Sequence, residues 1–291
     1  MTAKQPLTFK AQSHLKKSLT GKTILIKAGG NALTDEKTKK QIVSQIAYLH
    51  TIGAKPVIVH GGGIEIKQLL DDVGVTSEFV GGHRKTDARS MSYVEMALSG
   101  MVNKEITGLL NNAGVKAVGI SGKDGAMVTA KKRYHTETVD GKEKQSDLGF
   151  VGDVLKVDTS LINSLVDAGY IPVVSPVSIG EDGKSYNINA DMFAGHLAGE
   201  LHANKFFALT NIDGLLEDID QPDSIIQTLS PDEAANLFGT VIQGGMIPKI
   251  EACIIAINKG VNSAHIINGM KEDSLLRTLL TDESIGTTIQ N

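Results

Sequence analysis

Two lysines stand where a positive charge is costly or poorly placed for stability. Lys27 closes the short apolar run Ile24-Leu25-Ile26, where an unpaired cation is expensive to bury. Lys249 follows Pro248 at the start of a stretch with helical periodicity, and a cation in a first turn opposes the helix dipole. Either lysine could be solvated, as is common at strand and helix ends. An anionic ligand explains both placements better, so both lysines are candidates for stabilising negative charge.

Glycine-rich turns follow the apolar runs at four places. Glycine lacks a Cβ, so backbone N–H groups in these turns can approach a ligand closely, and at a helix start they favour anions. A single turn of this kind is as often merely a tight turn. Four turns at one sheet edge favour a phosphate or carboxylate site. They are Lys27-Ala28-Gly29-Gly30-Asn31, His60-Gly61-Gly62-Gly63, Ser121-Gly122-Lys123-Asp124-Gly125 and Thr210-Asn211-Ile212-Asp213-Gly214.

Other side chains that could take part in binding or catalysis have simpler explanations. Asp191 precedes a stretch of helical apolar spacing, and local context alone favours an N-cap. Cys253 lies among isoleucines and is predicted to be a core residue, and the histidines lack metal-ligand spacing. No metal site is therefore predicted. The chain also lacks the patterns G-x-x-x-x-G-K-[ST] and G-x-G-x-x-G, which excludes a standard P-loop NTPase and a standard dinucleotide dehydrogenase.

The elements that must position these residues alternate between short apolar runs and amphipathic stretches. This alternation predicts an α/β fold with a mainly parallel sheet covered on both faces. Residues 131–145 break the rhythm and predict an exposed hairpin with a turn at Asp140-Gly141. A lobe boundary is expected in the polar loop 180–184. The predicted strands are 24–26, 57–59, 117–120, 171–174, 206–209 and 264–267.

The composition of the 291-residue chain narrows the function classes. A net charge of −4 makes it a poor nucleic-acid binder, and no apolar run approaches the ~20 residues of a membrane span. The first 34 residues contain no acid, but they carry lysine rather than arginine and include the first predicted strand. A cytoplasmic location is therefore favoured over a transit peptide.

A series of motifs resembles the amino acid kinase family, and within it the N-acetylglutamate kinases, from about residue 22 to the end. The motifs follow the family order, and a series this long is far more specific than any one of them. The matching stretches are Lys27-Ala28-Gly29-Gly30-Asn31-Ala32, Val59-His60-Gly61-Gly62-Gly63, Arg84-Lys85-Thr86-Asp87, Val102-Asn103-Lys104-Glu105, Gly119-Ile120-Ser121-Gly122-Lys123-Asp124-Gly125, Asp147-Leu148-Gly149-Phe150-Val151-Gly152, Tyr186-Asn187-Ile188-Asn189-Ala190-Asp191, Gly244-Gly245-Met246-Ile247-Pro248-Lys249 and Gly286-Thr287.

The resemblance implies a three-layer αβα sandwich with a central, mainly parallel sheet. It implies an N-terminal lobe, 22–183, for the acyl amino acid and dimer formation, and a C-terminal lobe, 184–291, for ATP. The implied reaction moves the γ-phosphoryl group of ATP, with its Mg²⁺, to the side-chain carboxylate of N-acetyl-L-glutamate. This is a step of arginine biosynthesis. The carboxylate is already a nucleophile, so positioning and charge stabilisation suffice.

Site roles carry over from the resemblance onto matching positions. Lys27 and Lys249 resemble the two transition-state lysines, and Asp191 resembles the aspartate that orients them. Gly29 and Gly30, together with Gly62 and Gly63, resemble backbone donors to phosphate and substrate, and Arg84 and Asn187 resemble the groups that hold the substrate. Expected nucleotide contacts are Gly29, Gly30, Thr210, Asn211, Ile212, Asp213, Gly214, Leu215, Val241, Ile242 and Gln243.

Departures from the family pattern leave alternatives open. Ala28, His83 and the stretch Asn268-Gly269-Met270 replace the family's usual residues. The rival readings are an N-acetyl-aminoadipate kinase and a non-catalytic amino-acid sensor or docking partner.

Residues 1–21 form a tail in which Leu7, Ala11, Leu15 and Leu19 predict a short amphipathic helix. A homodimer is expected as the minimal unit, with a hexamer open only through this tail. A regulatory partner protein is also left open.

Overall fold

A computed structural model of the chain describes residues 10–139 and 142–291. The helices are α1 Ser13–Ser18, α2 Asn31–Thr34, α3 Glu36–Thr51, α4 Gly63–Asp72, α5 Ala88–Glu95, the π-helix η1 Met96–Val102, α6 Asn103–Asn112, the 3₁₀ helix η2 Asp124–Ala126, α7 Ser160–Asp167, α8 Ala190–Glu200, α9 Pro231–Asn236, the 3₁₀ helix η3 Gly244–Met246, α10 Ile247–Asn258 and α11 Ser274–Leu280. The strands are β1 Thr23–Ala28, β2 Lys55–His60, β3 Glu78–Val80, β4 His83–Lys85, β5 Ala117–Ser121, β6 Val128–Val139, β7 Lys142–Val157, β8 Ile171–Ser175, β9 Val177–Gly180, β10 Ser185–Ile188, β11 Lys205–Thr210, β12 Thr228–Leu229, β13 Ser263–Asn268 and β14 Thr287–Ile289.

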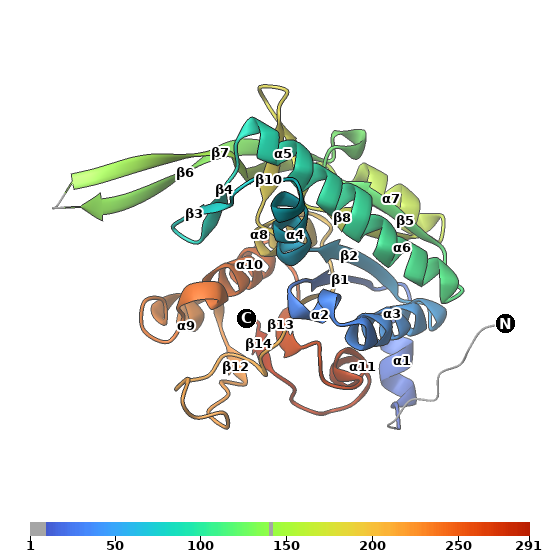
Figure 1. Cartoon of the computed structure of the whole chain (residues 1–291). Coiled ribbons are helices and arrows are strands. Elements are labelled where there is room, and N and C mark those ends of the chain that lie inside the picture. The colour runs from blue at the N-terminus through green and yellow to red at the C-terminus, as the bar shows by residue number, and fades with distance from the viewer. Residues whose placement is uncertain (1–9, 140–141) are drawn as a thin grey trace.

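An eight-stranded sheet forms the centre of the molecule, in the order β12-β14-β13-β11-β1-β2-β8-β5 (Figure 1). Neighbouring strands are parallel except for β13 and β14. Each of the six predicted strands corresponds to one of its members. The predicted α/β fold with a mainly parallel sheet is therefore confirmed.

Successive residues of β1 explain why both faces of the sheet are covered. Ile24 and Ile26 pack into a core shared with α3, α6 and α11, whereas Leu25 packs into a core shared with α7, α8 and α10. Side chains alternate between the two faces of a strand, so a continuous apolar run serves two helix layers at once. The three-layer arrangement follows directly from that run.

A long two-stranded arm leaves the body of the molecule (Figure 1). It consists of β6 and β7, which pair antiparallel and form a small barrel with β9 and β10 at the base of the arm. The hairpin predicted over 131–145 is confirmed, although the strands extend well beyond that range. The predicted turn Asp140-Gly141 lies outside the described residues.

Two features of the fold connect the parts of the chain on either side of the predicted lobe boundary. The central sheet runs without interruption through strands from both sides of residue 183. In addition, β10, which follows the predicted boundary, pairs with β7 and β9, which precede it. The division at 183 and 184 stays a prediction, and these pairings join the two parts through backbone hydrogen bonds.

The tail predicted to form a helix is helical over Ser13–Ser18, a shorter span than its apolar pattern covers. Leu19 is buried, while Ala11 and Leu15 pack against the core beside α11. Gln12 fixes this docking, since its backbone N–H donates to the Leu280 carbonyl at 3.0 Å. Leu7 lies outside the described residues. In the described part of the chain, none of the helices is sufficiently long and apolar to cross a membrane.

Candidate active site

The adjacent ends of β11, β1 and β2 lie at one edge of the sheet and bring together three of the four predicted glycine turns, while the turn after β5 lies at the end of the sheet. The Gly61 N–H donates to the Ala28 carbonyl at 2.8 Å, which ties the turn after β2 to the end of β1. The two turns pack so closely that a Cβ on Gly29 would lie 3.5 Å from Gly61 Cα and 3.1 Å from Lys27 Nζ. The edge predicted to receive an anion is thus lined by bare backbone beside a lysine ammonium.

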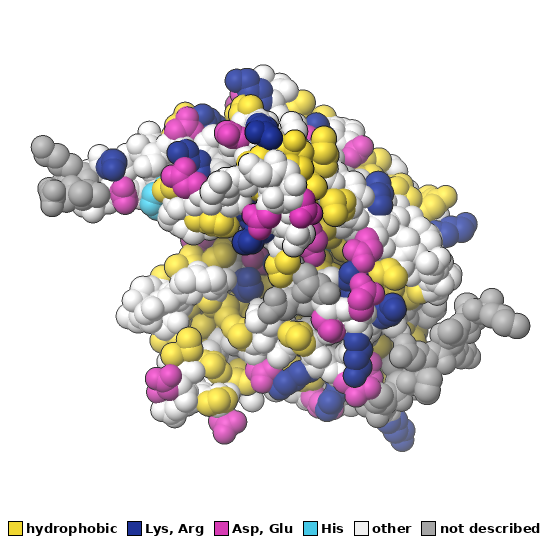
Figure 2. Space-filling view, in the orientation of Figure 1, with side chains coloured by type: hydrophobic (Ala, Val, Ile, Leu, Met, Phe, Trp, Pro, Cys, Tyr) yellow, Lys and Arg dark blue, Asp and Glu magenta, His cyan; other side chains and the backbone are white. Residues whose placement is uncertain are grey.

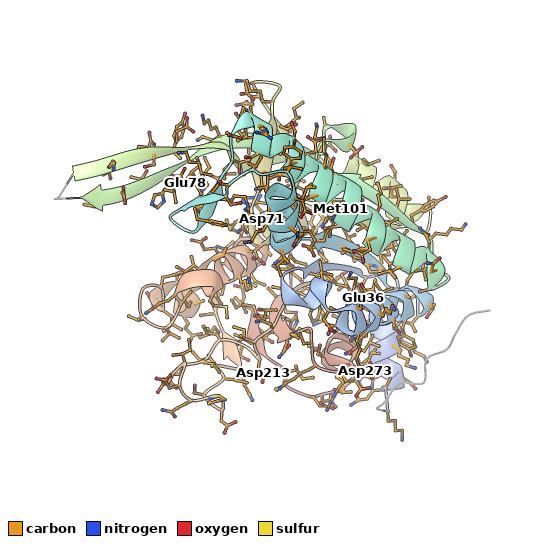
Figure 3. The ribbon with its side chains drawn as sticks, in the orientation of Figure 1. Glu36, Asp71, Glu78, Met101, Asp213 and Asp273 are labelled. Carbon is orange, nitrogen blue, oxygen red and sulfur yellow. The ribbon has the colours of Figure 1, made fainter. Side chains whose placement is uncertain are left out.

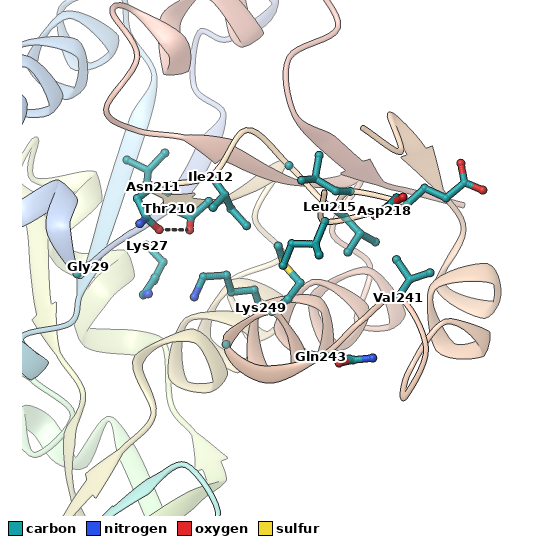
Figure 4. A pocket seen from close by; sticks show the side chains of 18 of the residues that line it. Lys27, Gly29, Thr210, Asn211, Ile212, Leu215, Asp218, Val241, Gln243 and Lys249 are labelled. Atoms are coloured by element: carbon teal, nitrogen blue, oxygen red, sulfur yellow. Dashed lines mark hydrogen bonds between the residues drawn. The ribbon is translucent and has the colours of Figure 1, made fainter. Parts of the chain in front are cut away.

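The charged centre of the site is one carboxylate between two ammonium groups. Lys27 Nζ lies 2.8 Å from Asp191 Oδ1, and Lys249 Nζ lies 3.2 Å from Asp191 Oδ2. Figure 4 shows the two lysine side chains reaching toward each other from β1 and α10. Lys27 and Asp191 are buried, while 17% of the Lys249 side chain is exposed. A net positive charge is therefore held at the point where the strand ends meet.

Burial and charge act in opposite directions on these groups. Burial raises the cost of ionising Asp191, but the attraction of Lys27 and Lys249 outweighs it and holds the pKa of that carboxyl below its ordinary value. Burial lowers the pKa of Lys27 despite the attraction of Asp191, and the nearby Lys249 lowers it further. Asp191 is therefore the group that keeps Lys27 charged in a buried position.

The start of α8 places Asp191. The side chain of Asn189 caps this helix by accepting from the N–H groups of Asp191 and Met192, at 2.9 and 3.2 Å. The interpretation of Asp191 as an N-cap is therefore wrong. Because Asn189 provides the cap, the Asp191 carboxylate in the first turn is free to face the lysines.

A pocket of about 820 Å³ opens beside this centre. The space-filling view shows a hollow between the part carrying β3 and β4 and the part carrying α9 and α10 (Figure 2). The residues that line the pocket itself come from β1 and the turn after it, from β11 and the loop after it, and from residues 240–249. Lys27 and Lys249 both line the pocket, so the charged centre forms one end of it. The predicted nucleotide contacts that line it are Gly29, Gly30, Thr210, Asn211, Ile212, Gly214, Leu215, Val241 and Gln243.

Two predicted nucleotide contacts do not line the pocket. Ile242 is fully buried in the core on the α8 and α10 side of the sheet. Asp213, labelled in Figure 3, accepts hydrogen bonds from Asn268 and Lys271 at 2.8 and 2.7 Å. The residues next to Asp213 and Ile242 in the sequence line the pocket. These two side chains therefore support the pocket-lining segments and do not face the cavity.

Several lining residues were missed from the sequence. Leu209, Gly245 and Met246 lie inside stretches identified from the sequence but were given no binding role, and the others lie next to such stretches, so only a wider window could have included them. The missed residues are Leu209, Leu216, Glu217, Asp218, Ile219, Thr240, Gly245 and Met246.

A further missed residue lies behind the pocket wall. Thr287 on β14 is fully buried, and its hydroxyl accepts a hydrogen bond from the Leu215 N–H at 2.8 Å. A Cβ on Gly214 would lie 2.9 Å from the same hydroxyl. The last strand of the sheet thereby fixes the backbone turn that lines the pocket.

Arg84 and Asn187, the predicted substrate contacts, lie on β4 and β10. Arg84 donates from Nη2 to the Gly63 carbonyl at 3.1 Å, and its Nη1 contacts the Ser77 hydroxyl. Its guanidinium lies 4.8 Å from the centre of the Phe79 ring. Arg84 is thus placed beside the start of α4, while Asn187 lies four residues before Asp191 on the strand that leads into α8.

A protein-held metal has no ready set of ligands in the described residues. No group of three or more His, Cys, Asp or Glu side chains gathers there in a way that could hold an ion. Cys253 is buried in the core as predicted, and burial raises the pKa of its thiol.

Comparisons with known proteins agree with the geometry. The model of the "Amino acid kinase family" matches residues 22–268. An acetylglutamate kinase from Heliobacterium modesticaldum is 45% identical, with 94% of this chain and 93% of that protein covered. An acetylglutamate kinase from Trichlorobacter lovleyi is 47% identical, with 93% and 92% covered.

Solved structures extend the comparison. An N-acetylglutamate synthase from Neisseria gonorrhoeae, complexed with coenzyme A and N-acetyl-glutamate, has a TM-score of 0.79 and 27% identity. The match covers 96% of this chain but only 61% of the synthase chain. A carbamate kinase from Giardia lamblia bound to AMP-PNP has a TM-score of 0.64 at 17% identity, covering 92% and 98% of the two chains, and shares the fold.

Proposed function

The chain belongs to the amino acid kinase family, and on this premise we propose that it transfers the γ-phosphoryl group of ATP to the side-chain carboxylate of N-acetyl-L-glutamate. The products are ADP and an acyl phosphate, and the step belongs to arginine biosynthesis. The relatives named acetylglutamate kinase, at 42–47% identity over most of the chain, support this assignment.

The observation that carries the proposal is the placement of Lys27 and Lys249 on either side of Asp191, at one end of a nucleotide-sized pocket. In the reaction a carboxylate oxygen forms a bond to the γ-phosphorus while the bond to the β,γ-bridging oxygen breaks. Negative charge spreads over the transferring group, and ammonium groups held in place beforehand stabilise it without reorganisation. Asp191 binds both ammonium groups and offsets the cost of burying Lys27.

The proposed binding roles divide the site in two. Arg84 and Asn187, with the backbone N–H groups of Gly62 and Gly63, hold the acyl amino acid, because a guanidinium can grip a carboxylate with two parallel donors. The pocket holds ATP. Mg²⁺ would bind the phosphates of the nucleotide, since the Asp191 carboxylate is already engaged by lysines and Mg²⁺ is commonly held through substrate phosphates.

The assignment is tested by ADP release with purified protein, MgATP and a panel of acceptors. The panel contains N-acetyl-L-glutamate, N-acetyl-aminoadipate, aspartate, carbamate and UMP. We expect a clear preference for N-acetyl-L-glutamate in kcat/KM. Equal or better turnover of another acceptor would contradict the proposed substrate, and binding of N-acetyl-L-glutamate without turnover would favour a sensor.

Assembly and location are part of the same proposal. We place the enzyme in the cytoplasm, where ATP is regenerated, as a homodimer that forms a hexamer only through the tail. Deleting residues 1–20 should leave ADP release intact. It should reduce any larger assembly to the dimer and abolish any inhibition by arginine. Light scattering and an arginine titration on both forms measure this, and a hexamer that survives the deletion would contradict it.

A further inference from the structure

A buried histidine and asparagine lie directly behind the glycine turn after β2. His60 and Asn103 are fully buried. Asn103 Nδ2 lies 2.8 Å from the Val173 carbonyl, 3.2 Å from the Ile120 carbonyl and 3.1 Å from His60 Nε2. His60 Nδ1 lies 2.8 Å from the Gly61 carbonyl. The pair therefore links α6 and the sheet interior to the glycine turn.

The partners fix every proton in this network. Carbonyl oxygens only accept, so the Asn103 amide must present its nitrogen to Val173 and Ile120, which share one of its two hydrogens, and the other hydrogen points to His60 Nε2. Nε2 is then an acceptor, and Nδ1 carries the proton donated to Gly61. Burial lowers the pKa of His60 to about 4, so this neutral tautomer persists near neutral pH.

The hydrogen bond to Gly61 sets the direction of the next donor. A trans peptide is planar, so the carbonyl of one residue and the N–H of the next point in opposite directions. With the Gly61 carbonyl held by the His60 ring, the Gly62 N–H points away from that ring. Among the backbone atoms and side chains that the structure describes, none accepts a hydrogen bond from this N–H.

Apolar packing holds the same turn from the other side. A Cβ on Gly62 would lie 2.7 Å from Leu98 Cδ2 and 3.2 Å from Val102 Cγ2. Both side chains belong to the π-helix η1, which runs directly into α6 and Asn103. A single helical segment therefore supplies both the packing and the hydrogen bond that restrain the turn.

We propose that His60, locked by Asn103, is a positioning residue that aims the Gly62 N–H at the anionic substrate. The inference rests on the proposed function, because it assigns the donor to the phosphoryl-transfer site. His60 touches neither substrate nor nucleotide. It acts by holding one peptide plane, and small misplacements of a donor at a reacting centre are costly.

The test compares His60→Leu with His60→Asn. The Asn side chain can place its Nδ2 where His60 has Nδ1, so it keeps the donor to Gly61, whereas Leu removes it. We expect His60→Leu to lower kcat/KM for N-acetyl-L-glutamate by about 100-fold. His60→Asn should stay within about fivefold of wild type on the same scale. ATP affinity, measured by calorimetry, should stay unchanged in both variants.

A matched control lies on the same helix. Asn111 also hydrogen-bonds to strand backbone, at both the N–H and the carbonyl of Ala117, but it is distant in sequence from the glycine turn. Asn111→Leu should lower stability without changing the kinetics, whereas Asn103→Leu should reproduce the kinetic loss of His60→Leu. Wild-type kinetics in His60→Leu would overturn the proposal, as would a loss in Asn111→Leu equal to that in Asn103→Leu.

A readout independent of activity separates this proposal from the proposed function. The ¹⁵N chemical shifts of the His60 ring in the wild-type protein should report the neutral Nδ1–H tautomer. An Nε2–H tautomer would overturn the positioning role even if the enzyme is active. A protein that shows the Nδ1–H tautomer and binds ATP but turns over no acceptor would instead contradict the proposed function.

Discussion

The glycine turns after β1 and β2 and the loop after β11 face the same charged centre, but they tolerate change very differently. At Gly29 and Gly62 in the glycine turns an added methyl group would approach Lys27 Nζ or Leu98 within 3.1 Å, whereas Gly30 and Gly63 have no atom within 4 Å of an added Cβ. In the loop after β11 the apolar side chains are partly open, with 41% of Ile212 and 86% of Ile219 exposed. We call the glycine turns after β1 and β2 the glycine wall, where atoms pack closely around Gly29 and Gly62. We call the loop after β11 the nucleotide wall, where side chains surround a roomy pocket.

The difference between the two walls shows where atoms must be placed precisely. Groups that meet the reacting atoms must be placed to a fraction of an ångström, since a small displacement can cost about 100-fold in rate. A nucleotide spreads its binding over many contacts, so no single one has to be exact. We therefore expect changes at the glycine wall to act mainly on kcat and changes at the nucleotide wall mainly on the KM for ATP.

The largest effect is expected where both walls meet, at Asp191. Asp191→Asn leaves buried Lys27 without a counter-ion, so kcat should fall by about 10³-fold and the free energy of unfolding by about 3 kcal/mol. Steady-state kinetics and urea unfolding measure both. Asp167→Asn is the matched control, because Asp167 forms an exposed ion pair with Lys55, 2.9 Å away, which should contribute less than about 1 kcal/mol. Near-normal turnover in Asp191→Asn would remove the charged centre from the mechanism.

The second effect tests the glycine wall alone. Gly29→Ala places a methyl group 3.1 Å from Lys27 Nζ, so kcat should fall by about 100-fold while the KM for ATP changes little. Gly108→Ala is the control, because nothing lies within 4 Å of a Cβ at this position in α6. It should raise stability by about 0.5–1 kcal/mol without altering kinetics. An unchanged kcat in Gly29→Ala would show that this wall is not tightly constrained.

The third effect concerns the buried histidine behind each wall. Burial lowers the pKa of His60 to about 4 and that of His265, which contacts Ser263 and Thr288 behind the nucleotide wall, to about 3. Below pH 6.5 the unfolded chain binds protons at both residues and the folded chain does not. The free energy of unfolding should therefore fall as pH falls, by about 1.5 kcal/mol per histidine between pH 6.5 and 5.

Urea unfolding at several pH values measures this loss. His60→Asn and His265→Asn should each remove a similar share of the slope in that range, and His50, His83 and His196, whose pKa values burial also lowers, should account for part of the remainder. Between pH 4 and 3 His265 should contribute more than His60, and carboxylates with a lowered pKa, such as Asp191, should add to the loss. A slope that neither substitution changes would assign the pH dependence to other groups.

The smallest effect tests the nucleotide wall. Thr287→Val removes the acceptor of the Leu215 N–H and leaves a buried donor unpaired, so the KM for ATP should rise about tenfold, with the KM for the acyl amino acid unchanged. Thr287→Ser should restore the wild-type value. Thr288→Val is the control on the same strand, because Thr288 contacts His265 at 3.1 Å instead of the pocket turn. A loss of kcat without a change in KM would contradict the division between the walls.

The sequence predicted the sheet because its strands are buried on both faces and read as continuous apolar runs. It also selected Lys27 and Lys249, because a cation in those local settings is unfavourable. It could not predict what depends on contacts between distant segments. Asp191 resembled an N-cap from its local context, whereas its contact with Lys249 spans 58 residues, and Thr287 acts on Leu215, 72 residues away in the sequence.

The hairpin of β3 and β4 escaped sequence prediction for a different reason. Glu78 and Phe79 are both exposed, so the strand has no alternation between buried and exposed side chains. The hairpin is placed by its contact with the arm, where a Cβ on Gly81 would overlap the ring of His135. Arg84, which this hairpin carries, was found only through the family resemblance.

The position of β1 in the middle of the sheet has a consequence for synthesis on the ribosome. Its partner β2 follows within 30 residues, but its other partner, β11, is translated nearly 180 residues later. At about 5–20 residues per second, β1 waits roughly 10–35 s with one edge unpaired. An unpaired apolar edge is a template for association with other chains. The strand that carries Lys27 therefore exposes an apolar edge to other chains until β11 has been made.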